Sequence, residues 1–409
     1  MLDLAHPSGN NFVRALLVAL EQAGELGSFH TTVAVQPSDW YVNLLPSNIR
    51  KELLRRTYNI SPAKISTRPW RELLRLLASK SNLDFLTAHE TGWASVDSIY
   101  QDLDQYVAEQ LTLTWKHNKI LGVYCYEDAA LHTFKAAKQL SLKCFYDLPI
   151  AYWQTSQKLL QEEAERLPEW EPTLVGTRDS QTKLERKTEE LDLADVVICP
   201  SKFVYDSLPS TARQTKKCIV AEFGSPQIKT PTRKPRDSKS SPLRVLFAGS
   251  MTQRKGLADV FAAIKMLNRA DVELVVMGSP LMPLEFYCDR LPNFTYEPTR
   301  PHQAVLELMQ SCDVFVLPSI VEGRALVQQE AMSCGLPLIV TANAGGEDLI
   351  DEGKTGFLVP MRSPQKIAQK IDWFADNRAR LDEMSTLARQ KAAQITWKDY
   401  CQKILSVIR

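Results

Sequence analysis

Two glutamates, Glu322 and Glu330, stand eight positions apart in the segment PSIVEGRALVQQEAMSCG, residues 318–335. If a helix spans that spacing, the two carboxylates lie roughly 12 Å apart, because an α-helix rises about 1.5 Å per residue. Carboxylates that far apart cannot share one metal ion or one proton. They can accept hydrogen bonds from two separate polyol groups, such as a sugar ring and a ribose bridged by a diphosphate.

The flanking residues predict how this segment is held. Asp313–Leu317 and Leu336–Thr341 are short apolar runs that are typical of buried parallel strands. Ala325–Ser333 favours a helix, and Gly335 followed by Pro337 would end it. The free amides at that helix start would attract a diphosphate. An ordinary strand–helix–strand unit with two solvated glutamates is the alternative.

A second candidate element, GSMTQRKG, runs from Gly249 to Gly256 directly after an apolar strand. It brings Ser250, Arg254 and Lys255 to the start of a new helix, where cations can meet a diphosphate. A P-loop would need its lysine after the second glycine, whereas Lys255 precedes it, so a P-loop is excluded. The alternative is that these cations are solvated at a helix start.

The segment from Pro318 to Pro337 resembles, without a gap, the signature of family-4 glycosyltransferases, P-S-x-x-E-G-[FR]-[GA]-x-x-x-x-E-A-M-x-x-G-x-P. The resemblance implies a retaining enzyme of the GT-B fold, with two doubly wound Rossmann-like domains facing each other across a cleft. It implies a nucleotide-diphospho-sugar donor and no cofactor or metal ion. The resemblance also implies that Glu330 binds the ribose, and that Glu322 and the amides of Gly323 and Arg324 bind the donor sugar. Arg324 stands where Phe is commoner.

Other segments add to the resemblance. Gly249–Gly256 is similar to the family's diphosphate element, which implies that Lys255 is the main phosphate contact, supported by Arg254. The pair Gly345–Gly346 follows another strand, where exposed amides could meet phosphate or sugar oxygens, although a plain turn explains it too. In the first half, Gly9 matches the first glycine of a Gly-Gly pair near the reacting phosphate.

The histidine that many relatives place at the end of a middle strand is absent from Cys144–Pro149. Asp147 could replace it as a general base or as support for an oxocarbenium-like charge, or it could be a turn residue before Pro149. The predicted site has a catalytic and a donor-binding group. The catalytic residues are Glu322, Lys255, Arg254 and Asp147, and the donor-binding residues are Glu330, Gly323, Arg324, Ser250, Gly249, Gly345, Gly346 and Gly9.

Strands alternate with helices along the chain, as in doubly wound α/β domains. The expected strands are Leu2–Ala5, Thr31–Gln36, Ile120–Cys125, Lys143–Asp147, Asp195–Cys199, Cys218–Phe223, Leu243–Gly249, Val272–Gly278, Phe294–Glu297, Asp313–Leu317 and Leu338–Thr341. The Pro-, Ser- and Lys-rich run KTPTRKPRDSKSSP reads as a linker. The predicted parts are an acceptor-side domain (1–228), the linker (229–242), a nucleotide-sugar domain (243–395) and a terminal helix (396–409) that either crosses back to the first domain or caps the second.

Composition excludes several classes of protein. The net charge of +1 over 409 residues argues against a general nucleic-acid binder. Eight scattered cysteines without C-x-x-C spacing are expected to be reduced core thiols, as in a cytoplasmic protein. No signal peptide or 18-residue apolar run is visible. Asp102 and Asp104 have D-x-D spacing but fall in a helical pattern, so we expect two solvated aspartates, and the six histidines suggest no metal site.

Residues Ile49–Lys80 hold nine Lys or Arg and two acids, interleaved with Trp70 and several leucines. This stretch could contact an anionic membrane at the inner face, with a saccharide or lipid-linked acceptor, or it could form two ordinary helices with a basic solvent face. Two other functions stay open at this stage: a sugar-nucleotide epimerase of the same architecture, and a non-catalytic nucleotide-sugar-binding protein.

Overall fold

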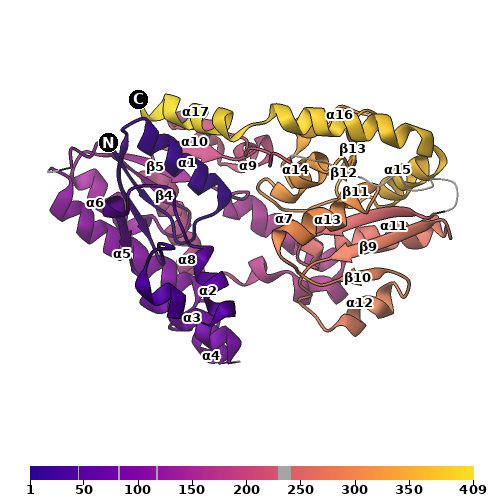
Figure 1. Cartoon of the computed structure of the whole chain (residues 1–409), viewed down its shortest axis with the longest axis horizontal. Helices are drawn as coiled ribbons and strands as arrows, with labels where there is room; N and C mark the ends of the chain where they lie inside the picture. The colour runs from indigo at the N-terminus through magenta and orange to yellow at the C-terminus, as the bar shows by residue number, and fades with distance from the viewer. Residues whose placement is uncertain (45, 82, 117, 229–240) are drawn as a thin grey trace.

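The computed structural model describes residues 1–44, 46–81, 83–116, 118–228 and 241–409, which form two α/β domains side by side (Figure 1). Each domain is built on one fully parallel sheet with helices on both faces, so the predicted pair of doubly wound domains is confirmed. Residues 229–240 of the predicted linker lie outside the described residues.

The N-terminal sheet has seven strands in the order β3-β2-β1-β4-β5-β6-β7. Its central strands are buried on both faces, which explains their near-continuous apolar sequences. The strands are β1 (Leu2–Ala5), β2 (Leu26–Thr31), β3 (Ile65–Thr67), β4 (Gly122–Tyr126), β5 (Lys143–Asp147), β6 (Val196–Cys199) and β7 (Lys217–Val220).

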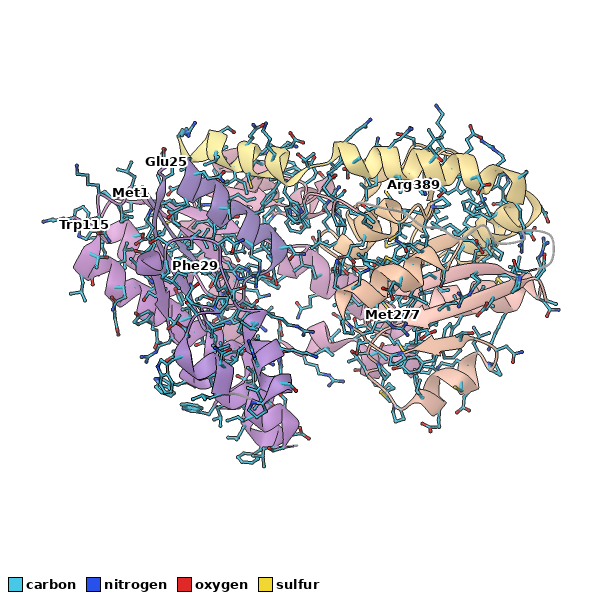
Figure 2. The ribbon with its side chains drawn as sticks, viewed as in Figure 1. Met1, Glu25, Phe29, Trp115, Met277 and Arg389 are labelled. Carbon is cyan, nitrogen blue, oxygen red and sulfur yellow. The ribbon has the colours of Figure 1, made fainter. Side chains whose placement is uncertain are left out.

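The C-terminal sheet has six strands in the order β10-β9-β8-β11-β12-β13. Figure 2 shows side chains packed around both sheets, including Phe29 in the first domain and Met277 in the second. The strands are β8 (Leu243–Ala248), β9 (Val272–Met277), β10 (Thr295–Glu297), β11 (Val314–Leu317), β12 (Leu338–Val340) and β13 (Gly356–Leu358).

Helices connect these strands in both domains (Figure 1). In the first half they are α1 (Asn11–Gln22), α2 (Ser47–Leu54), α3 (Trp70–Lys80), α4 (Asp84–Thr87), α5 (Val96–Thr114), α6 (Leu131–Gln139), α7 (Trp153–Arg166), α8 (Gln181–Leu193), α9 (Lys202–Ser207) and α10 (Ser210–Thr215). In the second half they are α11 (Leu257–Leu267), α12 (Leu284–Arg290), α13 (His302–Gln310), α14 (Leu326–Ser333), α15 (Pro364–Asp376), α16 (Leu381–Gln394) and α17 (Trp397–Ile408).

The second strand was placed wrongly from sequence. The alternating residues of Thr31–Gln36 predict a strand, but the sheet uses Leu26–Thr31, whose Gly, Ser and His are poor strand formers. Val33 and Val35 instead pack with Val42 in a small cluster beside the sheet. Parallel pairing with β1 and β3 on either side therefore overrides local propensity.

The two domains exchange segments. At the C-terminus, α17 packs against α1, and its Tyr400 and Ile404 belong to the core of the N-terminal domain. In the opposite direction, α7 and the following 3₁₀ turn η3 (Pro168–Thr173) leave the N-terminal domain, and Trp170, 3% exposed, enters the core of the C-terminal domain. Each core thus contains residues from the other half of the chain.

Candidate active site

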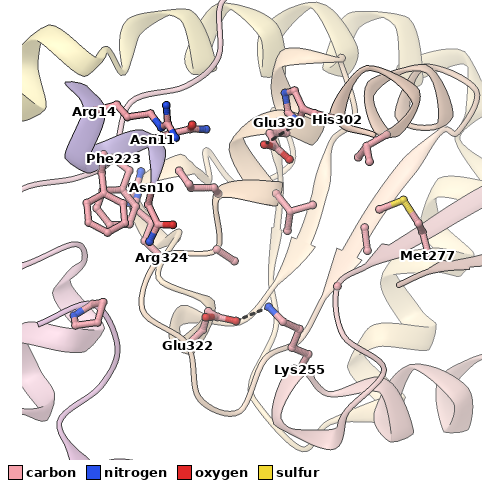
Figure 3. Close-up of a pocket in the computed structure, with 18 of the residues that line it drawn as sticks. Asn10, Asn11, Arg14, Phe223, Lys255, Met277, His302, Glu322, Arg324 and Glu330 are labelled. Atoms are coloured by element: carbon pink, nitrogen blue, oxygen red, sulfur yellow. Dashed lines mark hydrogen bonds and ion pairs between the residues drawn. The ribbon is translucent and has the colours of Figure 1, made fainter. Parts of the chain in front are cut away.

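A cavity of about 890 Å³ lies between the domains at the carboxyl ends of their strands. Gly9, Asn10 and Arg14 line it from the N-terminal domain, and Lys255 and Glu330 line it from the C-terminal domain (Figure 3). Ligands of open parallel sheets bind outside the carboxyl strand ends, where the connections diverge. The cavity is therefore the candidate active site.

The motif that contains the two glutamates folds as strand, loop and helix. β11 ends at Leu317, residues 318–325 form an extended loop, and α14 begins at Leu326. Glu330 lies on α14 and Glu322 in the loop, and both line the cavity. Burial raises the pKa of Glu330, while His302, whose Nδ1 lies 3.7 Å from a Glu330 oxygen, opposes that shift.

Glu322 lies between two cations. Its carboxylate is 2.5 Å from Nζ of Lys255, the contact drawn in Figure 3, and 3.3 Å from Arg254. Burial alone would raise the pKa of Glu322, but the charges of Arg254 and Lys255 outweigh it and lower the pKa to about 2. The three side chains therefore carry one net positive charge at neutral pH, and two of them, Glu322 and Lys255, line the cavity.

Contacts with neighbouring segments hold the turn that carries Arg254 and Lys255 in place. Gly256 follows it with φ = +77°, and a Cβ there would lie 2.2 Å from the carbonyl oxygen of Pro318, so glycine is required. The amide of Gln253 donates to Thr173 in the segment that crosses from the first domain, at 3.1 Å. Arg166 of the same segment forms a bidentate pair with Asp259, which also accepts a hydrogen bond from Gln253.

The side chain of Arg324 points into the protein. Its guanidinium donates to Gln329 at 2.9 Å, to the carbonyl of Gly345 at 3.0 Å and to both oxygens of Asp348 at 2.7 and 2.9 Å. Arg324 is 4% exposed. A bidentate, fully engaged arginine fixes the relative position of the loops it joins. Arg324 therefore holds the motif loop against residues 345–348.

Three of the predicted donor-binding glycines pack tightly against protein atoms. A Cβ on Gly323 would lie 1.7 Å from the carbonyl oxygen of Pro149, across the domain boundary. Gly345 has φ = +74° and approaches the carbonyl of Gly323, while Gly346 approaches the side chain of Gln328. Gly323, Gly345 and Gly346 do not line the cavity, nor do Ser250 and Arg254, among the described residues.

Asp147 is also separate from the cavity. It ends β5 and is 2% exposed, and one of its oxygens has no hydrogen-bond partner among the described residues. Burial raises the pKa of Asp147 from 3.8 to about 7, and the nearby charge of Glu127 adds to that effect. The neighbouring Pro149 lines the cavity instead.

Replacing Asp147 by asparagine should stabilise the protein more as the pH rises. A carboxyl group whose pKa is raised on folding destabilises the folded state increasingly from its unfolded pKa, 3.8, up to its folded pKa, about 7. The difference in Tm between Asp147→Asn and wild type should therefore grow over that interval and level off above it. Asp289→Asn, which replaces an exposed carboxyl group, is measured over the same pH range as a control for the substitution itself. A constant difference for Asp147→Asn would contradict the prediction.

Several cavity residues were not predicted from sequence. They are Asn10, Asn11, Arg14, Arg300 and His302, of which His302 begins α13 and faces Glu330 in Figure 3. Arg14 donates to the backbone carbonyls of Gly9, Thr57 and Arg55 and has no carboxylate partner in the described part of the chain. Arg14 lies one helical turn into α1, five residues after Gly9. That closeness to Gly9 is the feature of the sequence that could have indicated a cavity residue here.

Two possible metal groups are explained by other contacts. Asp104 is 2% exposed and accepts hydrogen bonds from the amides of His132 and Thr133 at the start of α6, so the prediction that it is solvated was wrong. Asp102 pairs with Arg68. His89, Glu90 and Asp179 also gather within 4.8 Å outside the cavity, but their oxygens already accept from Ser180 and Lys183.

Comparisons with known proteins agree with this architecture. Residues 229–391 match the family described as "Glycosyl transferases group 1". A D-inositol 3-phosphate glycosyltransferase of Catenulispora acidiphila is 29% identical over 181 residues, 40% of this chain and 43% of that protein. An amylovoran biosynthesis glycosyltransferase of Erwinia amylovora is 25% identical over 174 residues, 38% of this chain and 42% of the other. The chain thus matches less than half the length of these relatives.

Solved structures match the whole chain at low identity. Sucrose-phosphate synthase from Thermosynechococcus elongatus superposes with a TM-score of 0.66 and 17% identity over 100% of this chain and 98% of that one. Anabaena HepE, solved with UDP and glucose, gives 0.62 and 16% over the same shares. Such identities establish the fold alone. Residues 229–391 therefore match the Glycosyl transferases group 1 family, and the described residues have the GT-B fold.

Proposed function

We propose that this protein is a retaining, metal-independent glycosyltransferase that moves a hexosyl group from a nucleotide-diphospho-sugar to an acceptor hydroxyl. The main support is that Glu330, the Glu322–Lys255 pair and Gly9 of the other domain all line one cavity. The group 1 domain and the UDP and UDP-glucose complexes of the HepE structure are consistent with such a donor.

In the proposed complex the C-terminal domain binds the donor. Glu330 accepts hydrogen bonds from the ribose hydroxyls, and the diphosphate lies beside Lys255 and Arg254, whose charges Glu322 only half neutralises. Because its pKa is about 2, Glu322 stays ionised and can only accept hydrogen bonds, so its role is to hold sugar hydroxyls and to orient Lys255. His302 and Arg300 flank the Glu330 end.

In the proposed reaction the protein mainly stabilises the negative charge on the leaving diphosphate, and no side chain is needed as a base. As the bond from the sugar's anomeric carbon to the phosphate oxygen breaks, negative charge grows on the diphosphate, and Lys255 stabilises it. The acceptor oxygen bonds to the same face of the anomeric carbon, and its proton passes to the departing phosphate. Asp147 is buried away from the cavity and receives no proton in this scheme.

A panel of UDP-, GDP- and ADP-hexoses in a thermal-shift assay tests the donor. A ligand at about 100 times its Kd adds roughly 2.7 kcal/mol to the free energy of unfolding, which gives a measurable rise in Tm. The accepted donor is then incubated with saccharide and lipid-linked acceptors, and NMR of the product's anomeric proton reports whether the configuration is retained. An inverted product would contradict the retaining mechanism.

Transfer should continue in excess EDTA, because Lys255 and Arg254 supply the positive charge that a metal ion supplies in metal-dependent transferases. Initial rates measured before and after chelation should agree. Loss of activity that Mg²⁺ or Mn²⁺ restores would overturn metal independence.

A further inference from the structure

Large apolar side chains are exposed mainly in one part of the N-terminal domain. Of the fourteen exposed large hydrophobic residues within the described ranges, eight fall between residues 40 and 93. We name these eight the aromatic lobe: Trp40, Leu44, Ile49, Trp70, Leu77, Leu83, Phe85 and Trp93. Soluble monomers rarely expose such a concentration of apolar surface without a partner.

The lobe is a folded surface. Its helices α2, α3 and α4 lie together at one end of the N-terminal domain (Figure 1). Val42, which precedes α2, shares a small core with Leu53 of α2 and Leu73 of α3. On α3, Trp70 and Leu77 are two helical turns apart and so lie on one face, with 71% and 60% of their surface exposed. The packing of Leu73 on the inner side of α3 therefore leaves the face with Trp70 and Leu77 exposed.

Most cations of the basic stretch are not available to a partner, contrary to what its charge suggests. Arg56 and Arg75 pair with Glu72 at 2.9 and 2.7 Å, and Arg68 pairs with Asp102 at 3.1 Å. Other pairs join Arg71 to Asp102, Lys64 to Glu21 and Arg55 to Glu52. Arg50 and Lys51, which directly follow Ile49 on α2, are exposed and make no side-chain hydrogen bond or ion pair within the described residues, so the lobe has two free cations.

We propose that the aromatic lobe docks on the surface of an anionic lipid bilayer. Tryptophan, phenylalanine and leucine beside a few free cations match the headgroup region, where apolar rings insert and positive charge meets lipid phosphate. The proposed contact is a peripheral one. Within the described ranges no helix has the length and apolar character needed to cross a bilayer.

One residue links the lobe to the cavity. Arg55 directly follows α2, which carries Ile49 of the lobe, and it lines the cavity wall. This point rests on the proposed function: a lipid-linked acceptor could then reach the donor without leaving the membrane. The docking itself does not depend on it, because vesicle binding and donor binding are measured separately.

The test is sedimentation of the full chain with two kinds of vesicle, one of phosphatidylcholine alone and one of equal parts phosphatidylcholine and phosphatidylglycerol. Wild type should bind the anionic vesicles at low salt. The variant Trp70→Ser/Leu77→Ser/Phe85→Ser should bind at least roughly tenfold more weakly. The matched control, Leu113→Ser/Leu121→Ser, removes side chains that are equally exposed, at 70% and 71%, but outside the lobe, and it should bind like wild type.

The charge arm uses Arg50→Ser/Lys51→Ser. Each free cation near an anionic surface strengthens binding about fivefold, so this variant should bind anionic vesicles roughly 25-fold more weakly, and salt should reduce the difference. All variants should keep wild-type donor affinity, which separates failure of docking from failure of the proposed function. Equal binding by wild type and the triple lobe variant, or no binding of wild type to anionic vesicles, would overturn the proposal. So would a wild-type dimer that the lobe variant converts to monomer, since a second copy would then cover the lobe.

Discussion

Replacing Lys255 by methionine should lower turnover by roughly 10²- to 10³-fold while changing donor affinity much less. In the proposed reaction, the charge that Lys255 meets is larger in the transition state than in the bound donor, because the diphosphate gains negative charge as it leaves. Lys255 lies 2.5 Å from Glu322 and lines the cavity, so its ammonium group is held in place before the donor arrives. Steady-state kcat together with calorimetric Kd separates the two effects.

Removing Lys255 also changes its partner. Glu322 would keep only Arg254, at 3.3 Å, so the pKa of its buried carboxyl group should rise. Thermal unfolding is therefore needed to confirm that Lys255→Met is folded at the assay temperature. Lys265→Met, an exposed lysine on α11, is the matched control and should keep wild-type turnover. A kcat for Lys255→Met equal to that of wild type would reduce Lys255 to a structural partner of Glu322.

Replacing Glu330 by alanine should raise the Kd of the donor and of the free nucleoside diphosphate alike, by about 10- to 100-fold. Both ligands contain the ribose that Glu330 is proposed to hold, and a hydrogen bond to a charged group is worth about 1.5–3 kcal/mol. Burial on α14 already partly desolvates the Glu330 carboxyl group and raises its pKa, so binding the ribose adds a smaller desolvation cost.

Calorimetric titration of both ligands checks the Glu330 assignment. Glu307→Ala on α13 removes an exposed carboxylate nearby and should leave both affinities unchanged. If Glu330→Ala weakened the donor but not the nucleoside diphosphate, Glu330 would contact the sugar instead of the ribose. If neither affinity changed in the folded variant, the ribose site would have to be sought elsewhere.

The second domain was largely predictable because its local signals agree with its tertiary structure. β8, β9, β11 and β12 are apolar runs buried on both faces, and their sequence boundaries were correct to within a residue or two. The glycine after Lys255 adopts a left-handed conformation directly before α11, where a new helix was expected to begin. The strand β13 was missed because only three residues pair, and Gly356 is one of them.

The misplaced features depend on contacts between distant residues. Nothing near Leu26–Thr31 in sequence indicates that β3, more than thirty positions later, completes its pairing. Arg324 belongs to the motif and was expected to bind the donor. Its side chain instead points inward, because it donates hydrogen bonds to Asp348, Gln329 and the Gly345 carbonyl. Asp147 ends its strand as expected, but it is buried close to Tyr124 of β4 and to Tyr400 of α17, at the other end of the chain.

The exchange of α7–η3 and α17 between the domains limits how such a chain can recombine. A chimera cut between β7 and β8 would take Trp170 away from Phe261 and Phe286, and would separate Tyr400 from Phe223. Each core would then contain side chains from an unrelated domain in place of its native contacts. Grafting a new donor specificity onto this scaffold therefore means moving residues 153–173 together with the second domain and leaving 397–408 with the first.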